Sequence, residues 1–508
     1  MITGNWVGGI RIDEMLIPIL VEFREQENIM EGEITFVQES VTCKIHKINN
    51  SREFIAFWFH YLGRRMAFSG KIIQGSKCYG TIQYEEYIGF LHIESYFEIG
   101  FEELKNCVGS YKKSNGNFID CEWNKHSIKY IDFESGKYGV AFPTSPCNFD
   151  KKWPLTDNFE KPSQTQMQFL KDEFNDQRRL RFITKESTCV AQKYQSVTTE
   201  KISFTNDKFK LAGTLYKPAQ SVCWPAVVMI HDQGSKRNGD FWPHPMFFAR
   251  HGIGVLTYDK RGTGNSQGNW QNSTFSDLAD DALGAIRYIQ NREDVKRDQI
   301  GLWAQGEGGY ISSIISQNNI DQISWFVFLS FFPLSPVQKR ILDKKINLIR
   351  LNFNEYEISE AVEYEEQVFE ILGSDYKWNH LDSLFFKFRD RTWFPYADKV
   401  YSKYDKRWDF FRLNMHFDPM PFFKKITKPV LSIFPQCDDN RVYKNSIKSF
   451  DEAFKEKKNI TYKLIPNCDY SLLSTDRRED EENSSNYFSL DAFAKQIQWI
   501  EKTIFLKS

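Results

Sequence analysis

Ile300–Gly309 reads Ile-Gly-Leu-Trp-Ala-Gln-Gly-Glu-Gly-Gly, an apolar run that ends in a turn rich in glycine. A short apolar run bounded by turn residues is typical of a buried β-strand. A helix is expected directly after Gly309, so the turn would lead from the strand into that helix. The stretch is therefore predicted to form the strand-to-helix corner of an α/β domain.

Strands and helices alternate on both sides of this corner. Ala226–Ile230 is an apolar run suited to a buried parallel strand. Phe275–Gln290 has helical spacing, and Asp277 lies in its first turn, where a carboxylate interacts favourably with the helix dipole. Further strands are expected at 202–204, 210–216, 253–258, 325–330, 429–434 and 460–465, and further helices at about 245–251, 447–454 and 490–505. This alternation predicts a doubly wound, mostly parallel sheet within residues 200–508, covered by helices on both faces.

Residues 1–150 show a different pattern, in which short apolar and polar alternations are separated by turn residues. Glu33–Val37 and Glu53–Phe59 are examples. Such spacing predicts an all-β, barrel-like N-terminal domain. We expect a packed interior and a role as a docking module; a ligand cavity inside the barrel is the alternative.

Residues 151–199 are polar and mixed in pattern, and we expect them to connect the two domains. The run Arg178–Arg181 is interpreted as a solvated face, because the chain has no basic excess for it to join. The 508 residues carry 66 basic and 67 acidic side chains, with a formal net charge of -1. This balance gives no reason to expect nucleic acid or an anionic membrane as a partner.

The sequence also lacks the marks of several other classes of protein. No apolar stretch approaches the roughly 18 residues of a membrane span, and the N-terminus lacks the basic and apolar regions of a signal peptide. A cytoplasmic location is therefore expected. The nine cysteines are scattered without metal-ligand spacing, which predicts reduced thiols. His231, His244 and His251 fall on different elements, so we expect neither a metal site nor a cofactor.

Three phrases of the chain resemble α/β-hydrolases of the serine aminopeptidase and dienelactone hydrolase-like branch. They are Leu211–Pro218 (Leu-Ala-Gly-Thr-Leu-Tyr-Lys-Pro), Tyr258–Ser266 (Tyr-Asp-Lys-Arg-Gly-Thr-Gly-Asn-Ser) and Ile300–Trp303. Members with a β-rich N-terminal domain are similar in layout to nearly the whole chain. The resemblance implies a helical cap, inserted at about 336–418 over the active site of the sheet.

The resemblance also assigns places to a catalytic triad, in which a nucleophile, an imidazole and a carboxylate act together. Related chains carry serine in a Gly-x-Ser-x-Gly turn. Gly308 and Gly309 match the small residues after that serine, which puts Gly306 at the serine position. The carboxylate position falls on Asp438 and the histidine position on Tyr470. A phenol with an ordinary pKa of about 10 cannot act as a histidine-like base near neutral pH.

The turn that supplies oxyanion-hole donors departs from the family pattern as well. Related chains usually read His-Gly after this strand, whereas here the strand ending at Ile230 is followed by His231 and Asp232. A carboxylate that points inward at this turn would oppose the negative charge that develops during acyl transfer. Departures at Gly306, Tyr470 and Asp232 therefore fall on three parts of one mechanism.

We therefore predict a pseudo-hydrolase with a degenerate catalytic triad, which has lost Ser/His acyl transfer and binds a small-molecule or peptide-like ligand or a protein partner. Its predicted pocket consists of His231, Asp232, Gly306, Glu307, Trp393, Asp438 and Tyr470. The alternative is a non-hydrolytic enzyme of a specialised pathway, such as a lyase, cyclase or isomerase, with Glu307, Asp438 and Tyr470 as acid and base. A third hypothesis makes the β-rich domain the docking face of a protein complex.

Overall fold

The chain is divided into two compact units. The computed structural model describes residues 2–504 except 13–14, 28, 37–40, 62–63, 85–86, 125–126, 154–164, 172–177, 207, 319, 375, 401, 437–446, 448–449, 452–453 and 475–486. Unit 1 comprises Met1–Gln195 and Arg477–Phe488, and unit 2 comprises Ser196–Asp476 and Ser489–Ser508. In the described part of the chain, no helix is long and apolar enough to cross a membrane.

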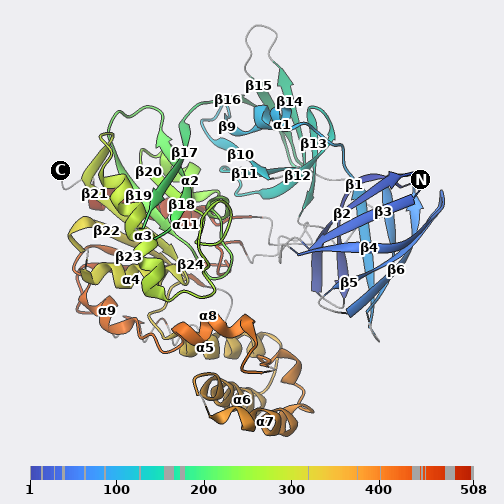
Figure 1. Ribbon diagram of the computed structural model, residues 1–508. Coiled ribbons are helices and arrows are strands. Elements are labelled where there is room, and N and C mark those ends of the chain that lie inside the picture. The colour runs from blue at the N-terminus through green and yellow to red at the C-terminus, as the bar shows by residue number, and fades with distance from the viewer. Residues whose placement is uncertain are drawn as a thin grey trace. The chain divides into compact units, whose positions relative to one another are not determined.

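Unit 1 begins with a closed barrel of antiparallel strands, β1 to β8 (Figure 1). The barrel closes where β1 pairs with β8, and Gly8 lies at this closure. A Cβ at Gly8 would lie 1.8 Å from the carbonyl oxygen of His92, so only glycine lets the two strands approach this closely. Trp6, Phe23 and Phe57 are among the apolar side chains of its core. The strands are β1 (Gly4–Ile12), β2 (Met15–Gln26), β3 (Ile29–Phe36), β4 (Val41–Asn50), β5 (Phe54–Tyr61), β6 (Arg64–Ile73), β7 (Lys77–Tyr84) and β8 (Tyr87–Ser95).

A second closed barrel, β9 to β16, follows in the same unit. The short helix α1 (Phe101–Cys107) precedes it, and Leu104 and Cys107 of this helix are buried in the same apolar cluster as Tyr111, Tyr130 and Phe169. The strands are β9 (Gly109–Lys112), β10 (Phe118–Asn124), β11 (Ser127–Asp132), β12 (Tyr138–Ser145), β13 (Asn148–Trp153), β14 (Gln166–Lys171), β15 (Arg178–Ile183) and β16 (Thr188–Lys193). Each of the two barrels therefore has an apolar core of its own.

The structure differs from the sequence prediction over residues 151–199. The sequence predicts a connection here, but the described part of the segment contains β14, β15 and β16 of the second barrel. Along β15, Leu180 and Phe182 are buried while Arg179 and Arg181 are exposed. The outward arginines make the segment look polar in composition and conceal its alternation. The interpretation of the arginine run as a solvated face fits these two residues, although not the partly buried Arg178.

Unit 2 is built on one large sheet with the strand order β17-β18-β20-β19-β21-β22-β23-β24. β18 is antiparallel to both of its neighbours, β17 and β20, and the remaining pairs are parallel. The strands are β17 (Val197–Thr205), β18 (Lys210–Pro218), β19 (Trp224–Ile230), β20 (Gly254–Tyr258), β21 (Val295–Gln305), β22 (Trp325–Leu329), β23 (Val430–Gln436) and β24 (Ile460–Pro466). The prediction of a mostly parallel, doubly wound sheet is confirmed.

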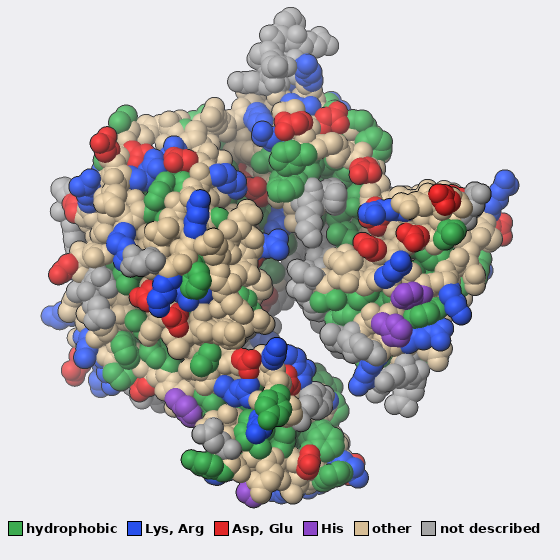
Figure 2. Space-filling model, viewed as in Figure 1, with side chains coloured by type: hydrophobic (Ala, Val, Ile, Leu, Met, Phe, Trp, Pro, Cys, Tyr) green, Lys and Arg blue, Asp and Glu red, His purple; other side chains and the backbone are tan. Residues whose placement is uncertain are grey.

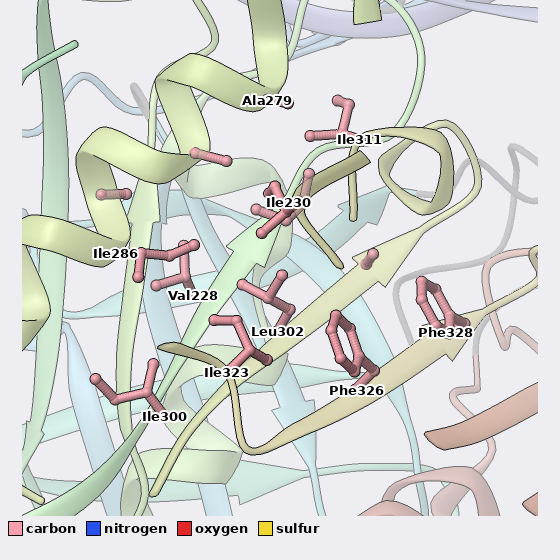
Figure 3. Packing of buried hydrophobic residues seen from close by; sticks show 14 of the residues in the cluster. Val228, Ile230, Ala279, Ile286, Ile300, Leu302, Ile311, Ile323, Phe326 and Phe328 are labelled. Carbon is pink, nitrogen blue, oxygen red and sulfur yellow. The ribbon is translucent and has the colours of Figure 1, made fainter. Parts of the chain in front are cut away.

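Helices cover both faces of this sheet. On one face, Val228, Leu302 and Phe326 belong to a large apolar cluster to which α3 and α4 contribute (Figure 3). On the other face, the Trp303 indole N–H donates to Gln496 Oε1 of α11 (2.8 Å), and the Trp303 ring lies 4.9 Å from the ring of His244 in α2. These helices are α2 (His244–Arg250), α3 (Phe275–Gln290), α4 (Gly308–Asn318) and α11 (Leu490–Ile504).

Between β22 and β23 the chain inserts a set of helices, which we call the cap (residues 336–418). Its helices are α5 (Pro336–Arg350), α6 (Glu355–Leu372), α7 (Leu381–Phe388) and α8 (Asp409–Asn414); α9 (Met420–Lys425) then leads back to the sheet. Ser335 and Gln338 cap the start of α5 reciprocally, with Pro336 at the first helical position. The cap has an apolar core of its own, centred on Tyr364 and Phe388.

Charged side chains of both signs are spread over the surface of unit 2. Figure 2 shows Lys and Arg side chains intermixed with Asp and Glu over its visible face. The near-equal totals of 66 basic and 67 acidic residues agree with this distribution. This face therefore carries intermixed charges of both signs.

The role of β15 in the second core can be tested with neighbouring substitutions. Leu180→Ala should lower the free energy of unfolding by about 2–5 kcal/mol, because Leu180 is wholly buried in the barrel. Arg181→Ala removes an exposed side chain and should change it by less than about 0.5 kcal/mol. Urea denaturation followed by circular dichroism measures both variants. Equal and small effects would contradict the position of β15 in the barrel wall.

Candidate functional site

The turn after β21 has the form of an elbow that presents a nucleophile. β21 ends at Gln305 and α4 begins at Gly308, so the chain reverses over two residues. Gly306 has a φ of +47°, in the left-handed region that favours glycine. Its N–H donates to the carbonyl of Leu329 (3.0 Å), and its own carbonyl accepts from the N–H of Gly309 (2.9 Å). Gly306 thus lies in a strand-to-helix turn of the kind that carries the serine of hydrolases.

Two side chains from other loops fill the space next to Gly306. Asp232 follows β19, and Tyr470 follows β24. Tyr470 Oη donates a hydrogen bond to Asp232 Oδ2 (2.9 Å). A Cβ added to Gly306 would lie 1.7 Å from Tyr470 Oη and 2.2 Å from Asp232 Oδ1. A serine side chain therefore does not fit at position 306 unless these two groups move.

The Asp232 carboxylate also occupies a donor that an oxyanion would need. The backbone N–H of Glu307, the residue after the nucleophile position, donates to Asp232 Oδ1 (3.1 Å). In the serine enzymes, the N–H at this place is one of the oxyanion-hole donors. In this chain the donor is therefore already bonded to a side chain of the protein itself.

Tyr470 is held as a neutral hydrogen-bond donor. Burial, together with the neighbouring charge of Asp232, raises the pKa of the Tyr470 phenol far above its ordinary range. Its backbone carbonyl accepts from Ser330 Oγ (2.9 Å) and from Gln305 Nε2 (3.5 Å). Lys339 Nζ, on cap helix α5, lies 5.7 Å from the centre of the Tyr470 ring. These contacts fix Tyr470 in place and leave it unable to accept a proton near neutral pH.

Glu307 forms a buried ion pair with Lys260. Lys260 Nζ lies 2.7 Å from Glu307 Oε1, and the two side chains are 2% and 9% exposed. Burial raises the pKa of the Glu307 carboxyl, and the positive charge of Lys260 opposes that rise. The ammonium group also lies 5.0 Å from the ring centre of Trp270 and 5.3 Å from that of Phe410. The Glu307 carboxylate is therefore paired with the buried ammonium group of Lys260.

His231 connects the turn after β19 to the neighbouring strand β20 by a hydrogen bond. Its Nε2–H donates to the carbonyl of Tyr258 in β20. Burial, with a contribution from the charge of Lys260, lowers the pKa of His231 to about 3. The imidazole is therefore neutral at physiological pH, and its Nε2 proton is used in a structural hydrogen bond.

Of the other predicted pocket residues, Trp393 lies apart from this cluster. The structure places Trp393 in the apolar core of the cap, where its indole N–H donates to Glu360 Oε2 (2.9 Å). Asp438, the predicted carboxylate of the triad, lies outside the described residues. Within the described part of the chain, no group of three or more His, Cys, Asp or Glu side chains could hold a metal ion. The cluster that the structure does bring together is Asp232, Gly306, Glu307 and Tyr470, with His231 close by.

Sequence reasoning missed Lys260 and Ser330 as parts of this site. Lys260 is in the phrase Tyr258–Ser266, but nothing in the sequence pairs it with Glu307. Ser330 directly follows β22 with a φ of +54°, which is uncommon for a residue other than glycine. The sequence shows only that Ser330 follows a buried strand, and this does not predict its contact with Tyr470.

The chain is similar to several known proteins. Residues 244–349 match a family described as serine aminopeptidase, S33. Unit 2 has the α/β-hydrolase fold. The quorum-quenching protein AidA of Acinetobacter baumannii (strain MDR-ZJ06) is 26% identical over 109 residues, which are 21% of this chain and 36% of that relative. The match thus spans little more than a third of the length of the curated relative.

Solved structures of α/β-hydrolases are also similar to the chain. The α/β-hydrolase GrgF from Penicillium sp. sh18 is 16% identical, with 60% of this chain and 99% of that chain covered and a TM-score of 0.38. The proline iminopeptidase-related protein from Thermus thermophilus is 14% identical, with 60% and 98% covered and a TM-score of 0.38. Est1E from Butyrivibrio proteoclasticus, solved with bound ferulic acid, is 17% identical, with 60% and 99% covered and a TM-score of 0.36.

The filled space at the elbow gives a test by substitution. Gly306→Ala should lower the free energy of unfolding by about 2–4 kcal/mol, because the new Cβ overlaps Tyr470 Oη and the left-handed backbone disfavours a side chain. Gly239→Ala is the matched control in unit 2, since a Cβ there would meet no atom within 4 Å, and it should change stability by less than about 0.5 kcal/mol.

The same experiment in a second background identifies what fills the space. In a protein that carries D232G and Y470F, the cost of Gly306→Ala should fall by about 1–2 kcal/mol, because the groups that the Cβ meets are gone. Urea denaturation of the four proteins measures this coupling. An undiminished cost would mean that Asp232 and Tyr470 do not restrict position 306.

Proposed function

We propose that this chain is a pseudo-hydrolase, an α/β-hydrolase-fold protein that no longer performs Ser/His acyl transfer and functions by binding. The observation that carries the proposal is the position of the Asp232 carboxylate. One of its oxygens accepts the Glu307 N–H and the other accepts the Tyr470 O–H, beside a glycine at the nucleophile position. Asp232 thereby bonds to the oxyanion-hole donor (Glu307 N–H) and to the residue at the base position (Tyr470), next to the nucleophile position (Gly306).

Each of the three positions removes a different requirement of acyl transfer. Gly306 offers no nucleophile, Tyr470 offers no base near neutral pH, and the Glu307 N–H is already bonded to a carboxylate. Loss of one oxyanion-hole donor alone costs about 2.7–4 kcal/mol of transition-state stabilisation in a serine enzyme. Because triad members act as a unit, a single compensating residue would not restore the reaction.

The binding function is assigned to surfaces outside this filled space. The protein's own side chains occupy the place where the acyl group of a substrate would lie. A peptide-like ligand or a protein partner therefore fits the geometry better than a small molecule in the former catalytic position. We propose the cap and the two barrels of unit 1 as the parts that make such contacts.

The alternative function is a non-hydrolytic reaction that uses Glu307 as an acid or base. The buried position of this carboxyl group and its raised pKa are the observations that favour it. Against it stands the ion pair with Lys260, which commits one carboxylate oxygen of Glu307 and neutralises its charge. We therefore place the binding function first.

Activity assays on the purified full-length protein test the proposal. Incubation with p-nitrophenyl acetate and butyrate should give no turnover above that of buffer, and a fluorophosphonate probe should leave the protein unlabelled. Glu307→Gln should behave in the same way. Ester turnover or labelling that disappears in Asp232→Asn, Tyr470→Phe or Glu307→Gln would overturn the proposal.

A further inference from the structure

A pair of cysteines shares one arginine in the second barrel. Cys107 is the last residue of α1, Cys147 lies in the turn between β12 and β13, and Arg178 is the first residue of β15. Arg178 Nη1 donates to Cys147 Sγ (3.5 Å) and to Cys107 Sγ (3.7 Å). Because both sulfurs contact the same nitrogen, they lie no farther apart than the sum of these two distances. The fold thus brings together two thiols from segments well separated in sequence.

The two thiols differ in access. Cys107 is fully buried, its S–H donates to the carbonyl of Glu103 (3.5 Å), and burial raises the pKa of its thiol to about 12. Cys147 is half-buried, so a small polar reagent can reach it. A guanidinium group next to a thiol favours the thiolate, which is the nucleophilic form. The arrangement therefore combines an accessible thiol (Cys147), a buried thiol (Cys107) and a guanidinium group that contacts both sulfurs (Arg178).

We propose that Cys107 and Cys147 form a peroxide-responsive dithiol that Arg178 activates. The Cys147 thiolate attacks one oxygen of hydrogen peroxide, the O–O bond breaks, and uptake of a proton gives Cys147 sulfenic acid and one water. The sulfur of Cys107 then attacks the sulfur of Cys147, the S–O bond breaks, and the departing hydroxide leaves with the Cys107 proton as a second water. Two thiols lose two electrons to form one disulfide, and the peroxide gains them.

Closure of the bond requires the two segments to move towards each other. Cys107 ends a helix and Cys147 lies in a short turn, so both are at ends of elements, where small backbone shifts cost less than within a strand. Disulfide formation requires the sulfurs to approach to about 2.05 Å. The bond would tie α1 to the β12–β13 turn at one end of the second barrel.

The other cysteines of the chain supply internal comparisons. Cys223 is exposed, in unit 2, and reports how fast peroxide oxidises a freely accessible thiol. Cys121 is fully buried in the second barrel, and burial raises the pKa of its thiol well above the ordinary value. Peroxide should therefore modify Cys147 before Cys223, and should leave Cys121 unchanged.

Peptide mapping of the full-length protein tests the proposal. The reduced and desalted protein is treated with graded amounts of hydrogen peroxide, free thiols are alkylated, and peptides are mapped by mass spectrometry without reduction. We expect a linked pair of peptides that contain Cys107 and Cys147, at peroxide ratios that leave Cys223 unmodified. In Cys107→Ala the reaction should stop at a Cys147 sulfenic acid that dimedone traps. Absence of the linked pair, or oxidation of Cys147 no faster than of Cys223, would overturn the proposal.

Arginine variants test the activating role separately. Arg178→Met should slow dimedone-trapped oxidation of Cys147 about tenfold, because the guanidinium group that contacts its sulfur is gone. Arg181→Met, an exposed neighbour on the same strand, should leave the rate unchanged. Circular dichroism shows whether Arg178→Met perturbs the barrel. Arg178→Lys keeps a cation at this position and should retain most of the rate. Equal rates in Arg178→Met and Arg181→Met would contradict the role of Arg178.

Discussion

The carboxylate of Asp232 holds the centre of unit 2 together, since it accepts the Glu307 N–H with one oxygen and the Tyr470 O–H with the other. This contact joins the loop after β19, the turn after β21 and the loop after β24. The remaining properties of the site depend on it. Asp232 and Tyr470 take the space that a side chain at position 306 would need, and burial of the phenol together with the neighbouring Asp232 raises the pKa of Tyr470.

The sheet topology explains why these residues meet. The carboxyl ends of parallel strands open at one edge of the sheet, where α/β proteins place their ligand and catalytic sites. An active hydrolase uses these loops to set a nucleophile, a base and oxyanion donors around a substrate. Here the same loops bind one another, because Asp232 accepts a hydrogen bond from each of the other two. Beside them, Lys260 and Glu307 compensate each other's buried charges, which would be costly alone.

Much of the fold and part of the site could be predicted from the sequence. The alternation around Ile300–Gly309 predicted the parallel sheet, and the family resemblance singled out Gly306, Asp232 and Tyr470, which the structure brings together. The direct contact between Asp232 and Tyr470 could not be predicted, because it joins residues far apart in sequence and depends on side-chain direction. The ion pair of Lys260 and Glu307 could not be predicted from the sequence for the same reason. The second barrel was missed because the outward arginines of β15 disguise its buried positions.

The central claim is that Asp232 and Tyr470, and not only the missing serine, prevent acyl transfer. Labelling of two variants by a fluorophosphonate probe measures this directly, with thermal unfolding as a check that both are folded. We predict that Gly306→Ser alone stays unlabelled, because the oxyanion donor remains bonded to Asp232 and no imidazole is present, and that the triple variant D232G, G306S and Y470H reacts. Labelling of Gly306→Ser alone at the rate of the triple variant would contradict the account.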